Sequence, residues 1–396
     1  MGKLKIACLQ FNPKLGDLDG NVRRADRILE ESQAEALGIG LLVLPEMAFS
    51  GYNFPDQQAI KPFLEPTASG LTAEWAKRTA QRLGCWVVAG YPEIDTGERE
   101  PELPEIHYEE NITPSEIPDD SVMAAGSTSP PSPPDPNIRA YNSALVVAPT
   151  PTPRVVGHYR KSHLYYTDYT WARENPAKTP FYTAVHPIAS SSSSPDDTPP
   201  RQLNVALGIC MDMNPYKFEA PYTDYEFGTH CRDSRADIII LPTAWLTLEV
   251  EKVFPHGFGI PQDHDEERDT VLEKMVEEVA GEAMEREEVR RKLEVEMQRE
   301  RRAADWDTVR YWAGRLRPIW DGSEAEGDGE VSGDGEGEEG GERRRAVFVS
   351  CNRVGVEGDA TYVGSSSVLE VETGRIRGLG SAGKGVEKLL VVEVDV

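Results

Sequence analysis

The sequence lacks the features of a nucleic-acid-binding, membrane-spanning or disulfide-rich protein. Lys and Arg number 42 against 68 Asp and Glu, which gives a formal net charge of -26 over 396 residues. Clustered cations are needed to hold phosphate backbones or anionic lipid, so neither a nucleic acid nor a membrane is expected as a partner. No apolar run approaches the roughly 18 residues that a membrane-spanning helix needs.

Cysteine is also scarce and unpaired. The five cysteines, Cys8, Cys85, Cys210, Cys231 and Cys351, form no CxxC pair and match no structural zinc spacing. This pattern predicts reduced thiols, no bound metal and no cofactor. The N-terminal residues run directly into an apolar strand pattern without a basic segment or a secretory cleavage site, so we expect a soluble, cytoplasmic protein.

The negative charge is concentrated in a few segments. Residues 93–138 carry twelve acidic residues and one Arg, and residues 321–345 carry ten acidic residues and three Arg. Together these segments contribute -18 of the net charge of -26. The acidity therefore belongs to solvated segments rather than to one charged functional surface.

Between these segments the chain reads as an α/β protein. Short β-rich runs alternate with amphipathic stretches at 21–37 and 72–83, and several runs are apolar at nearly every position, as in a sheet covered by helices. The predicted strands are 4–11, 40–44, 85–90, 143–148, 203–209, 237–241, 346–350 and 367–371.

Four stretches interrupt the pattern, at 93–138, 189–200, 249–305 and 321–345. The third contains a run dense in Glu, Arg and Lys at 265–304, which predicts a long charged helix. Strands resume after every interruption, so we expect residues 1–396 to form one domain with insertions. Near the end, residues 378–383 spell GxGxxG, but too little chain follows for a dinucleotide site, and we expect a flexible turn there.

Three local motifs place reactive side chains next to apolar strands. Glu46 follows the run 41–44 and Pro45, Lys161 lies in His-Tyr-Arg-Lys-Ser-His-Leu, and Cys210 follows the run 203–209. A partly buried carboxylate at a strand end can serve as a general base, a cation can stabilise an oxyanion, and a thiol at a sharp turn can serve as a nucleophile. Each residue taken alone also fits a non-catalytic role, as a surface acid, a surface cation or a buried structural cysteine.

The order Glu46, Lys161, Cys210 resembles the signature of the nitrilase, or carbon–nitrogen hydrolase, superfamily. The likeness extends to the N-terminal Ile-Ala-Cys-Leu-Gln-Phe-Asn-Pro, to Asn142-Ser-Ala, to Leu241-Pro-Thr-Ala-Trp and to Cys351-Asn-Arg-Val-Gly. It implies a four-layer αββα sandwich. Superfamily members often pair through their sheets, but large insertions would block that interface, so a monomer is favoured over a homodimer.

The resemblance also assigns roles. Amide hydrolysis needs a nucleophile, a base that becomes the acid and an oxyanion stabiliser, and these are Cys210, Glu46 and Lys161, the last aided by the Met211 backbone N–H. The family has a second glutamate after the lysine that positions the other groups, and Glu174 is the best match for it.

Within the superfamily, Cys210-Met-Asp-Met-Asn-Pro-Tyr and Ser50-Gly-Tyr-Asn-Phe resemble the fungal protein N-terminal amidases. This implies deamidation of N-terminal Asn and Gln in peptides or proteins, upstream of arginylation-dependent degradation. Such a site must pair the free α-ammonium with a carboxylate. The candidate substrate-binding residues are Asp212, Asp168, Glu219, Tyr52, Asn53 and Met211.

Two other functions remain open at this point. One is a nitrilase-type amidase of the ω-amidase or carbamoylase kind that acts on a small-molecule amide. The other is a non-enzymatic interaction protein in which the charged helix is the working part, although such a protein has no need of all three reactive residues.

Overall fold

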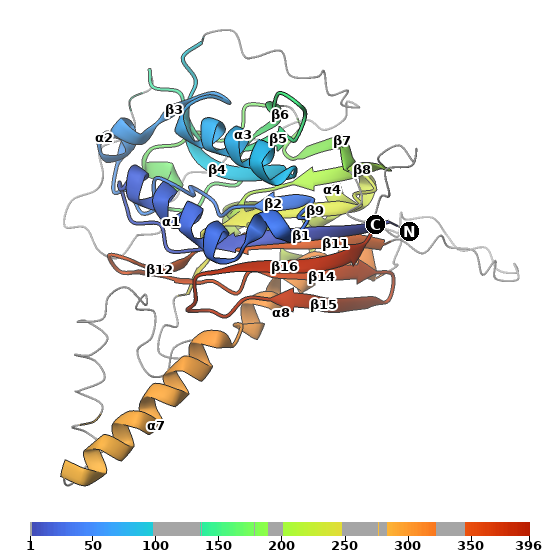
Figure 1. Cartoon of the computed structure of the whole chain (residues 1–396). Helices are drawn as coiled ribbons and strands as arrows, with labels where there is room; N and C mark the ends of the chain where they lie inside the picture. Colours follow the sequence, from blue (N-terminus) through green and yellow to red (C-terminus); the bar gives the residue numbers. More distant parts are fainter. Residues whose placement is uncertain are drawn as a thin grey trace, which may run out of the picture.

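The structure, a computed structural model, describes residues 2–97, 135, 137–177, 179–188, 201–247, 276, 283–321 and 345–396. Two mixed sheets stacked face to face form its centre (Figure 1). The first sheet has the strand order β16 (Lys388–Asp395), β1 (Lys3–Gln10), β2 (Leu41–Val43), β4 (Trp86–Ile94), β5 (Ala140–Ala148) and β6 (Arg154–Arg160), with β3 (Glu65–Pro66) beside β4.

The second sheet has the same organisation. Its strand order is β15 (Arg375–Ser381), β14 (Ser367–Glu372), β11 (Arg345–Asn352), β9 (Ile238–Thr243), β8 (Arg201–Leu207) and β7 (Tyr182–Ile188). The central strands are parallel in both sheets, β1–β2–β4 in the first and β8–β9–β11 in the second. A small third sheet is formed by β10 (Leu246–Thr247), β13 (Ala360–Val363) and β12 (Val354–Glu357).

Helices cover the outer faces of both sheets. On the first sheet lie α1 (Leu18–Glu31) and α3 (Leu71–Leu83), and on the second lie α4 (Glu226–Asp233), α8 (Trp306–Arg315) and α9 (Arg317–Trp320). The chain also contains α2 (Gln57–Ile60), α7 (Ala283–Arg302) and the short 3-10 turns η1 (Ala34–Ala36), η2 (Lys61–Phe63), η3 (Asp168–Thr170), η4 (Cys210–Met213), η5 (Tyr216–Phe218) and η6 (Tyr222–Asp224). The four-layer αββα sandwich is therefore confirmed.

Strand β1 shows why the central runs are apolar at nearly every position. Leu4, Ile6 and Cys8 face the second sheet, whereas Ala7 and Leu9 face the helices on the outer side. Because side chains alternate between the two faces of a strand and both faces are buried here, a continuous hydrophobic run is required.

The structure describes only parts of the four expected insertions. The residues that it does not describe in these regions are 98–134, 189–200, 248–275, 277–282 and 322–344. The first boundary was set too early, because Glu93 is a buried residue of β4 that pairs with Tyr141 of β5. The charged run does contain a helix, α7, which projects away from the sandwich (Figure 1).

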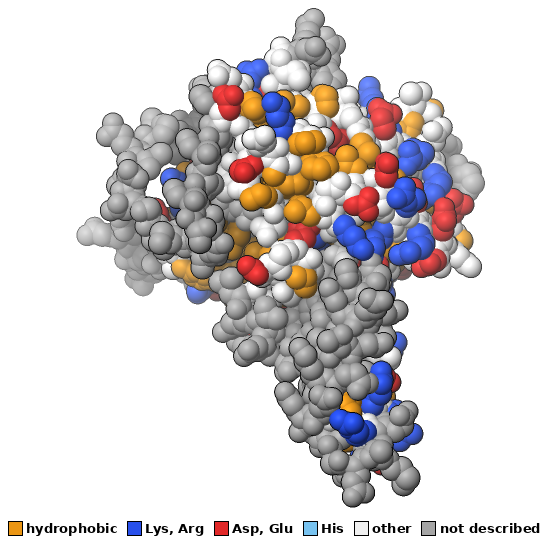
Figure 2. Space-filling model, turned by 90° about the vertical axis from the view of Figure 1, so that its left-hand side faces the viewer, with side chains coloured by type: hydrophobic (Ala, Val, Ile, Leu, Met, Phe, Trp, Pro, Cys, Tyr) orange, Lys and Arg blue, Asp and Glu red, His pale blue; other side chains and the backbone are white. Residues whose placement is uncertain are grey.

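The GxGxxG segment is not a turn, and that expectation was wrong. Gly378 and Gly380 lie within β15, where they pair with Leu369 and Val368 of β14. Among the described residues no helix is long and apolar enough to cross a membrane. On the face drawn in Figure 2, hydrophobic side chains gather near the centre of the sandwich and basic side chains gather along one margin.

Candidate active site

The two sheets bring the three reactive residues to one edge of the sandwich. Glu46 comes three residues after the end of β2, Lys161 directly after β6, and Cys210 three residues after the end of β8. Within each sheet these strands run in the same direction, since β6 is related to β4 by two antiparallel steps through β5. Their carboxyl ends therefore meet at one edge, where open α/β sheets place their ligand sites.

The turn that carries Glu46 is held close against β4. The backbone carbonyl of Pro45 accepts a hydrogen bond from the Gly90 N–H at 3.3 Å, and the Ala48 N–H donates to the Gly90 carbonyl at 3.0 Å. A Cβ atom at Gly90 would lie 2.7 Å from the Cα atom of Glu46, so only glycine permits this approach. The glycine thus fixes how far Glu46 reaches into the site.

The backbone at Cys210 has the conformation of a sharp strand-to-helix turn. Its φ is 44°, in the left-handed region that non-glycine residues rarely adopt. Asp212 stabilises the turn, because its carboxylate accepts the Ile209 N–H at 2.7 Å and the Tyr159 hydroxyl at 2.8 Å. The same carboxylate accepts the backbone N–H of His163 at 2.8 Å, which ties the turn of Cys210 to the segment of Lys161.

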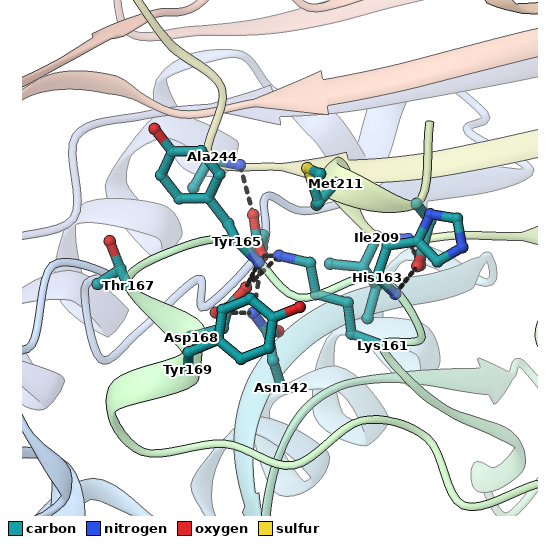
Figure 3. Close-up of polar contacts among 12 residues, drawn as sticks. Asn142, Lys161, His163, Tyr165, Thr167, Asp168, Tyr169, Ile209, Met211 and Ala244 are labelled. Atoms are coloured by element: carbon teal, nitrogen blue, oxygen red, sulfur yellow. Dashed lines mark hydrogen bonds and ion pairs between the residues drawn. The ribbon is translucent and has the colours of Figure 1, made fainter. Parts of the chain in front are cut away.

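A buried network of charges connects the site residues (Figure 3). The Lys161 ammonium lies 2.7 Å from Glu46 Oε1 and 2.6 Å from Asp168 Oδ2. The amide nitrogen of Asn142 donates to both carboxylates, at 2.7 Å to Glu46 and 2.9 Å to Asp168. The other oxygen of Glu46 accepts the Ala244 N–H at 2.8 Å.

These contacts set the protonation of the site. Burial raises the pKa of the Cys210 thiol well above its usual value, and the hydrogen-bonded, negatively charged Glu46 raises it further, against the opposing effect of Lys161. Burial also raises the pKa of Glu46, although Lys161 lowers it in part. Burial alone would lower the pKa of Lys161, but the carboxylates of Asp168 and Glu46 more than reverse this. The resting site therefore holds a neutral thiol beside a base and a permanent cation.

A cavity of about 250 Å³ opens over Cys210. Aromatic and apolar side chains form most of its wall, and Cys210 itself is 8% exposed. The lining residues are Tyr52, Tyr165, Cys210, Met211, Asn214, Phe218, Ala244, Trp245, Leu246 and Tyr311. A largely apolar site with a few fixed polar groups strengthens the electrostatic interactions inside it.

Of the catalytic residues predicted from the sequence, three meet and one does not. Glu46, Lys161 and Cys210 lie together as described, whereas Glu174 accepts hydrogen bonds from the hydroxyls of Tyr216 at 2.9 Å and Tyr169 at 3.4 Å. The carboxylate that contacts Lys161 in its place is Asp168. The interval after the lysine has no fixed pattern in the sequence, so only the three-dimensional structure distinguishes the two acids.

The predicted substrate-binding residues divide in the same way. Tyr52 and Met211 line the cavity, as expected for residues that meet a substrate. Asp212 and Asp168 are engaged by neighbouring protein groups, and Asn53 donates its backbone N–H to Glu357 Oε2 at 2.9 Å. Glu219 is exposed beside Phe218 and does not line the cavity.

Sequence reasoning missed several residues of the site. Asn142 had a detectable signal, because a carboxamide within a mostly apolar strand must find buried partners. Tyr165, Phe218 and Tyr311 had none, since aromatic residues at these positions read as ordinary packing and come from three separate parts of the chain.

Comparisons with known proteins identify similar sequences. The model of the carbon-nitrogen hydrolase family matches residues 5–108. The protein N-terminal amidase of Saccharomyces cerevisiae is 29% identical over 249 residues, a match that covers 61% of this chain and 45% of that protein. The protein N-terminal amidase of Schizosaccharomyces pombe is 21% identical over 385 residues, which is 94% of this chain and 93% of the relative.

Solved structures show the same fold. An N-terminal amidase with a Gln-Val peptide superimposes with a TM-score of 0.64 at 20% identity, covering 100% of this chain and 99% of the other. A member of branch 10 of the nitrilase superfamily from Saccharomyces cerevisiae gives a TM-score of 0.51 at 14% identity, covering 100% of this chain and 90% of the other. The carbon-nitrogen hydrolase model therefore matches the N-terminal part of the chain, and the chain as a whole has the α/β sandwich fold of the N-terminal amidase structures.

Proposed function

We propose that this protein is an amidohydrolase that converts N-terminal Asn and Gln of peptides or proteins to Asp and Glu with release of ammonia. The observation that carries the proposal is the contact network of Glu46, Lys161 and Cys210, in which Cys210 lines the cavity. Support also comes from the relatives, which are protein N-terminal amidases, and from solved amidase structures that hold Gln-Val and Asn-Glu peptides.

In the first half of the reaction, Cys210 Sγ attacks the carbon of the side-chain amide. Glu46 accepts the thiol proton as the S–C bond forms, which suits a neutral thiol hydrogen-bonded to a carboxylate. Lys161 and the Met211 N–H stabilise the negative oxygen of the tetrahedral intermediate. Glu46 then returns the proton to the amide nitrogen, the C–N bond breaks and ammonia leaves a thioester on Cys210.

In the second half, water cleaves the thioester. Glu46 takes a proton from the attacking water, the new C–O bond forms and the C–S bond breaks. The proton returns to the sulfur, which restores the neutral thiol and releases the carboxylic acid. The Glu46 carboxylate, held by Ala244 and Asn142, thus acts as base at the start of each half and as acid at the end of each half.

The proposal extends to the setting of the reaction. We place the enzyme in the cytoplasm, upstream of arginylation-dependent protein degradation, as a monomer. We take residues 1–396 as one domain with four insertions, because strand β16 at the end of the chain pairs with β1 at its start.

Mass spectrometry of three peptides tests the activity. The substrates are a peptide that begins with Asn, the same peptide N-acetylated, and one with Asn at an internal position. The wild-type protein should add about one dalton to the free N-terminal Asn peptide alone, and Cys210→Ala should add nothing. Cys231→Ala is the matched control, because Cys231 is also a buried thiol but lies on α4.

The other results lead elsewhere. Conversion of all three peptides would retain the amidase and remove its selectivity for the N-terminus. Conversion of none, together with hydrolysis of a small-molecule amide, would assign the chain to the ω-amidase or carbamoylase type. Equal activity in wild-type protein and Cys210→Ala would refute the thiol mechanism.

A further inference from the structure

The mouth of the cavity over Cys210 is more exposed to solvent than its base. Tyr52 and Cys210 at the base are buried, whereas Phe218 on the cavity wall is 48% exposed. Tyr166, which follows the cavity residue Tyr165, is 50% exposed. Single exposed apolar side chains are ordinary, but a contiguous exposed apolar patch at the rim of a pocket is typical of a surface that a ligand covers.

These exposed rings form one cluster. The ring centroids of Tyr166 and Phe218 lie 6.1 Å apart with an angle of 30° between the planes, and Tyr165 meets Phe218 edge-on at 6.4 Å. Tyr165 and Tyr166 are 5.1 Å apart. The cluster therefore continues the aromatic wall of the cavity outward onto the surface.

The backbone holds Phe218 in this position under strain. Lys217 and Phe218 have φ values of 55° and 58°, both in the left-handed region, although neither is glycine. Two adjacent bulky residues rarely adopt this conformation, and such outliers persist where the surrounding structure enforces them, often at ligand sites. The hydrogen bonds from the Glu219 and Ala220 N–H groups to the Tyr216 carbonyl, at 3.0 and 3.1 Å, enforce it here.

The size of the cavity determines what reaches this cluster. A cavity of about 250 Å³ lies below the roughly 300 Å³ at which pockets for drug-sized ligands begin, so it cannot enclose a whole peptide. If the side-chain amide of the first residue reaches Cys210, the peptide must leave through the mouth. The side chain of the second residue then meets Tyr166 and Phe218.

We propose that Phe218 and Tyr166 form a subsite for the second residue of the substrate and favour a large apolar or aromatic side chain there. This inference rests on the proposed function. The second side chain covers the two exposed rings and removes apolar surface of both partners from water.

Peptides that differ only in their second residue test the subsite. With N-terminal Asn followed by Gly, Asp, Leu or Phe, wild-type kcat/KM should be about fivefold higher for Leu and Phe than for Gly, as expected for partial burial of one side chain. In Phe218→Ala this ratio should fall below about twofold, because kcat/KM falls more for the Leu and Phe peptides than for the Gly peptide. Phe218→Leu should keep the preference.

Two controls make the result specific. Trp306→Ala removes an aromatic side chain that is 51% exposed and does not line the cavity, so it should retain the wild-type ratio. Thermal unfolding of each variant shows whether it is folded. Tyr166→Ala should weaken the preference independently of the backbone strain at Phe218.

The possible failures are distinguishable. If no peptide with N-terminal Asn is hydrolysed, the proposed function itself fails. If all four peptides are hydrolysed at equal rates, or if Phe218→Ala slows all of them equally, the amidase stands and the subsite is wrong. A preference for Asp would also overturn the subsite, and would point to the ammonium of Lys217 instead.

Discussion

A lysine that has no contact with water needs its charge balanced within the protein, and two carboxylates balance Lys161. Glu46 lies on one side of its ammonium and Asp168 on the other, while Asn142 bridges both acids. Three side chains carry two negative charges and one positive charge, so the negative charge of Asp168 adds to the effect of burial and raises the pKa of Glu46 further. Asp168 therefore both orients the cation and strengthens the base.

The Asp168→Asn variant removes the negative charge of Asp168 and keeps the size of its side chain, so it tests the electrostatic role of Asp168 apart from packing. We expect kcat/KM at neutral pH to fall about 100-fold, because Lys161 loses one of its two anchors and Glu46 becomes a weaker base. Loss of the Asp168 charge lowers the pKa of Glu46, so the acid limb of the pH profile should move to lower pH. Steady-state ammonia release measured across the pH range reports both changes.

Glu174→Gln is the matched control for that variant. Glu174 contacts the tyrosine hydroxyls of Tyr169 and Tyr216 rather than Lys161, so its neutral isostere should retain kcat/KM within about twofold and leave the acid limb in place. A large loss in Glu174→Gln with little effect in Asp168→Asn would return the positioning role to Glu174.

At the scale of elements, the central strands were predictable and the outer strands were not. All eight predicted runs became strands, including β1, β8 and β11, because both faces of each lie in the core and demand apolar residues throughout. Strand β7 was missed since it contains Pro187 and sits at a sheet edge, where proline is tolerated. Strand β15 was missed because its glycines resembled a turn.

In the candidate site, too, some residues could be predicted from the sequence and others could not. Glu46, Lys161 and Cys210 were predictable because each sits in a motif beside a strand. Asp168 in its role beside Lys161 was not, because the direction of a side chain in a short turn depends on partners distant in sequence. Phe218 was not predictable either, since its position depends on two left-handed residues that no sequence pattern announced.

Helix α3 has an unusual cap that makes its stability depend on pH. Its N-cap residue is Gly70, which offers no side chain, and Glu65 from β3 supplies the carboxylate instead. Glu65 accepts the Thr72 N–H at 2.7 Å and the Thr72 hydroxyl at 2.6 Å. Burial raises the pKa of Glu65 from 4.5 to about 7, although both contacts with Thr72 lower it in part.

This pKa gives a signed prediction for unfolding. The folded state holds the Glu65 proton more tightly than the unfolded chain, so its stabilising contribution is complete below pH 4.5 and is lost as the pH rises through about 7. The free energy of unfolding should fall by about 3 kcal/mol more in the wild type than in Glu65→Gln between pH 4.5 and pH 8. Denaturant titrations of both proteins measure this difference, and parallel pH curves would show that Glu65 is ionised throughout.

At the scale of the whole molecule, the two ends of the chain are joined in one sheet. Strand β1 pairs with β16 along eight residues, from Lys3 opposite Asp395 to Gln10 opposite Lys388. The long segment between β4 and β5 joins two strands that already pair with each other, with Ile94 opposite Ala140. The sandwich therefore depends on its last strand, whereas β4 and β5 need only a short connection.

This difference predicts opposite outcomes for two deletions. Removal of residues 98–134 would leave six residues between Asp95 and Arg139, whose backbone groups are hydrogen-bonded at 2.8 Å. Hairpin loops of that order are common, and the shorter connection reduces the entropy cost of closure by about 2 kcal/mol. The deletion should therefore fold cooperatively, with a melting temperature at least equal to that of the full chain and kcat/KM within about twofold of it.

Removal of residues 388–396 should have the opposite effect, because it takes β16 from beside β1 and removes Leu390, Val392 and Val394 from the core between the sheets. We expect no soluble, cooperatively unfolding protein from this shorter deletion. Circular dichroism melts and ammonia release compare the two. If the deletion of 98–134 also abolished cooperative unfolding, that segment would be part of the folded domain rather than an insertion into it.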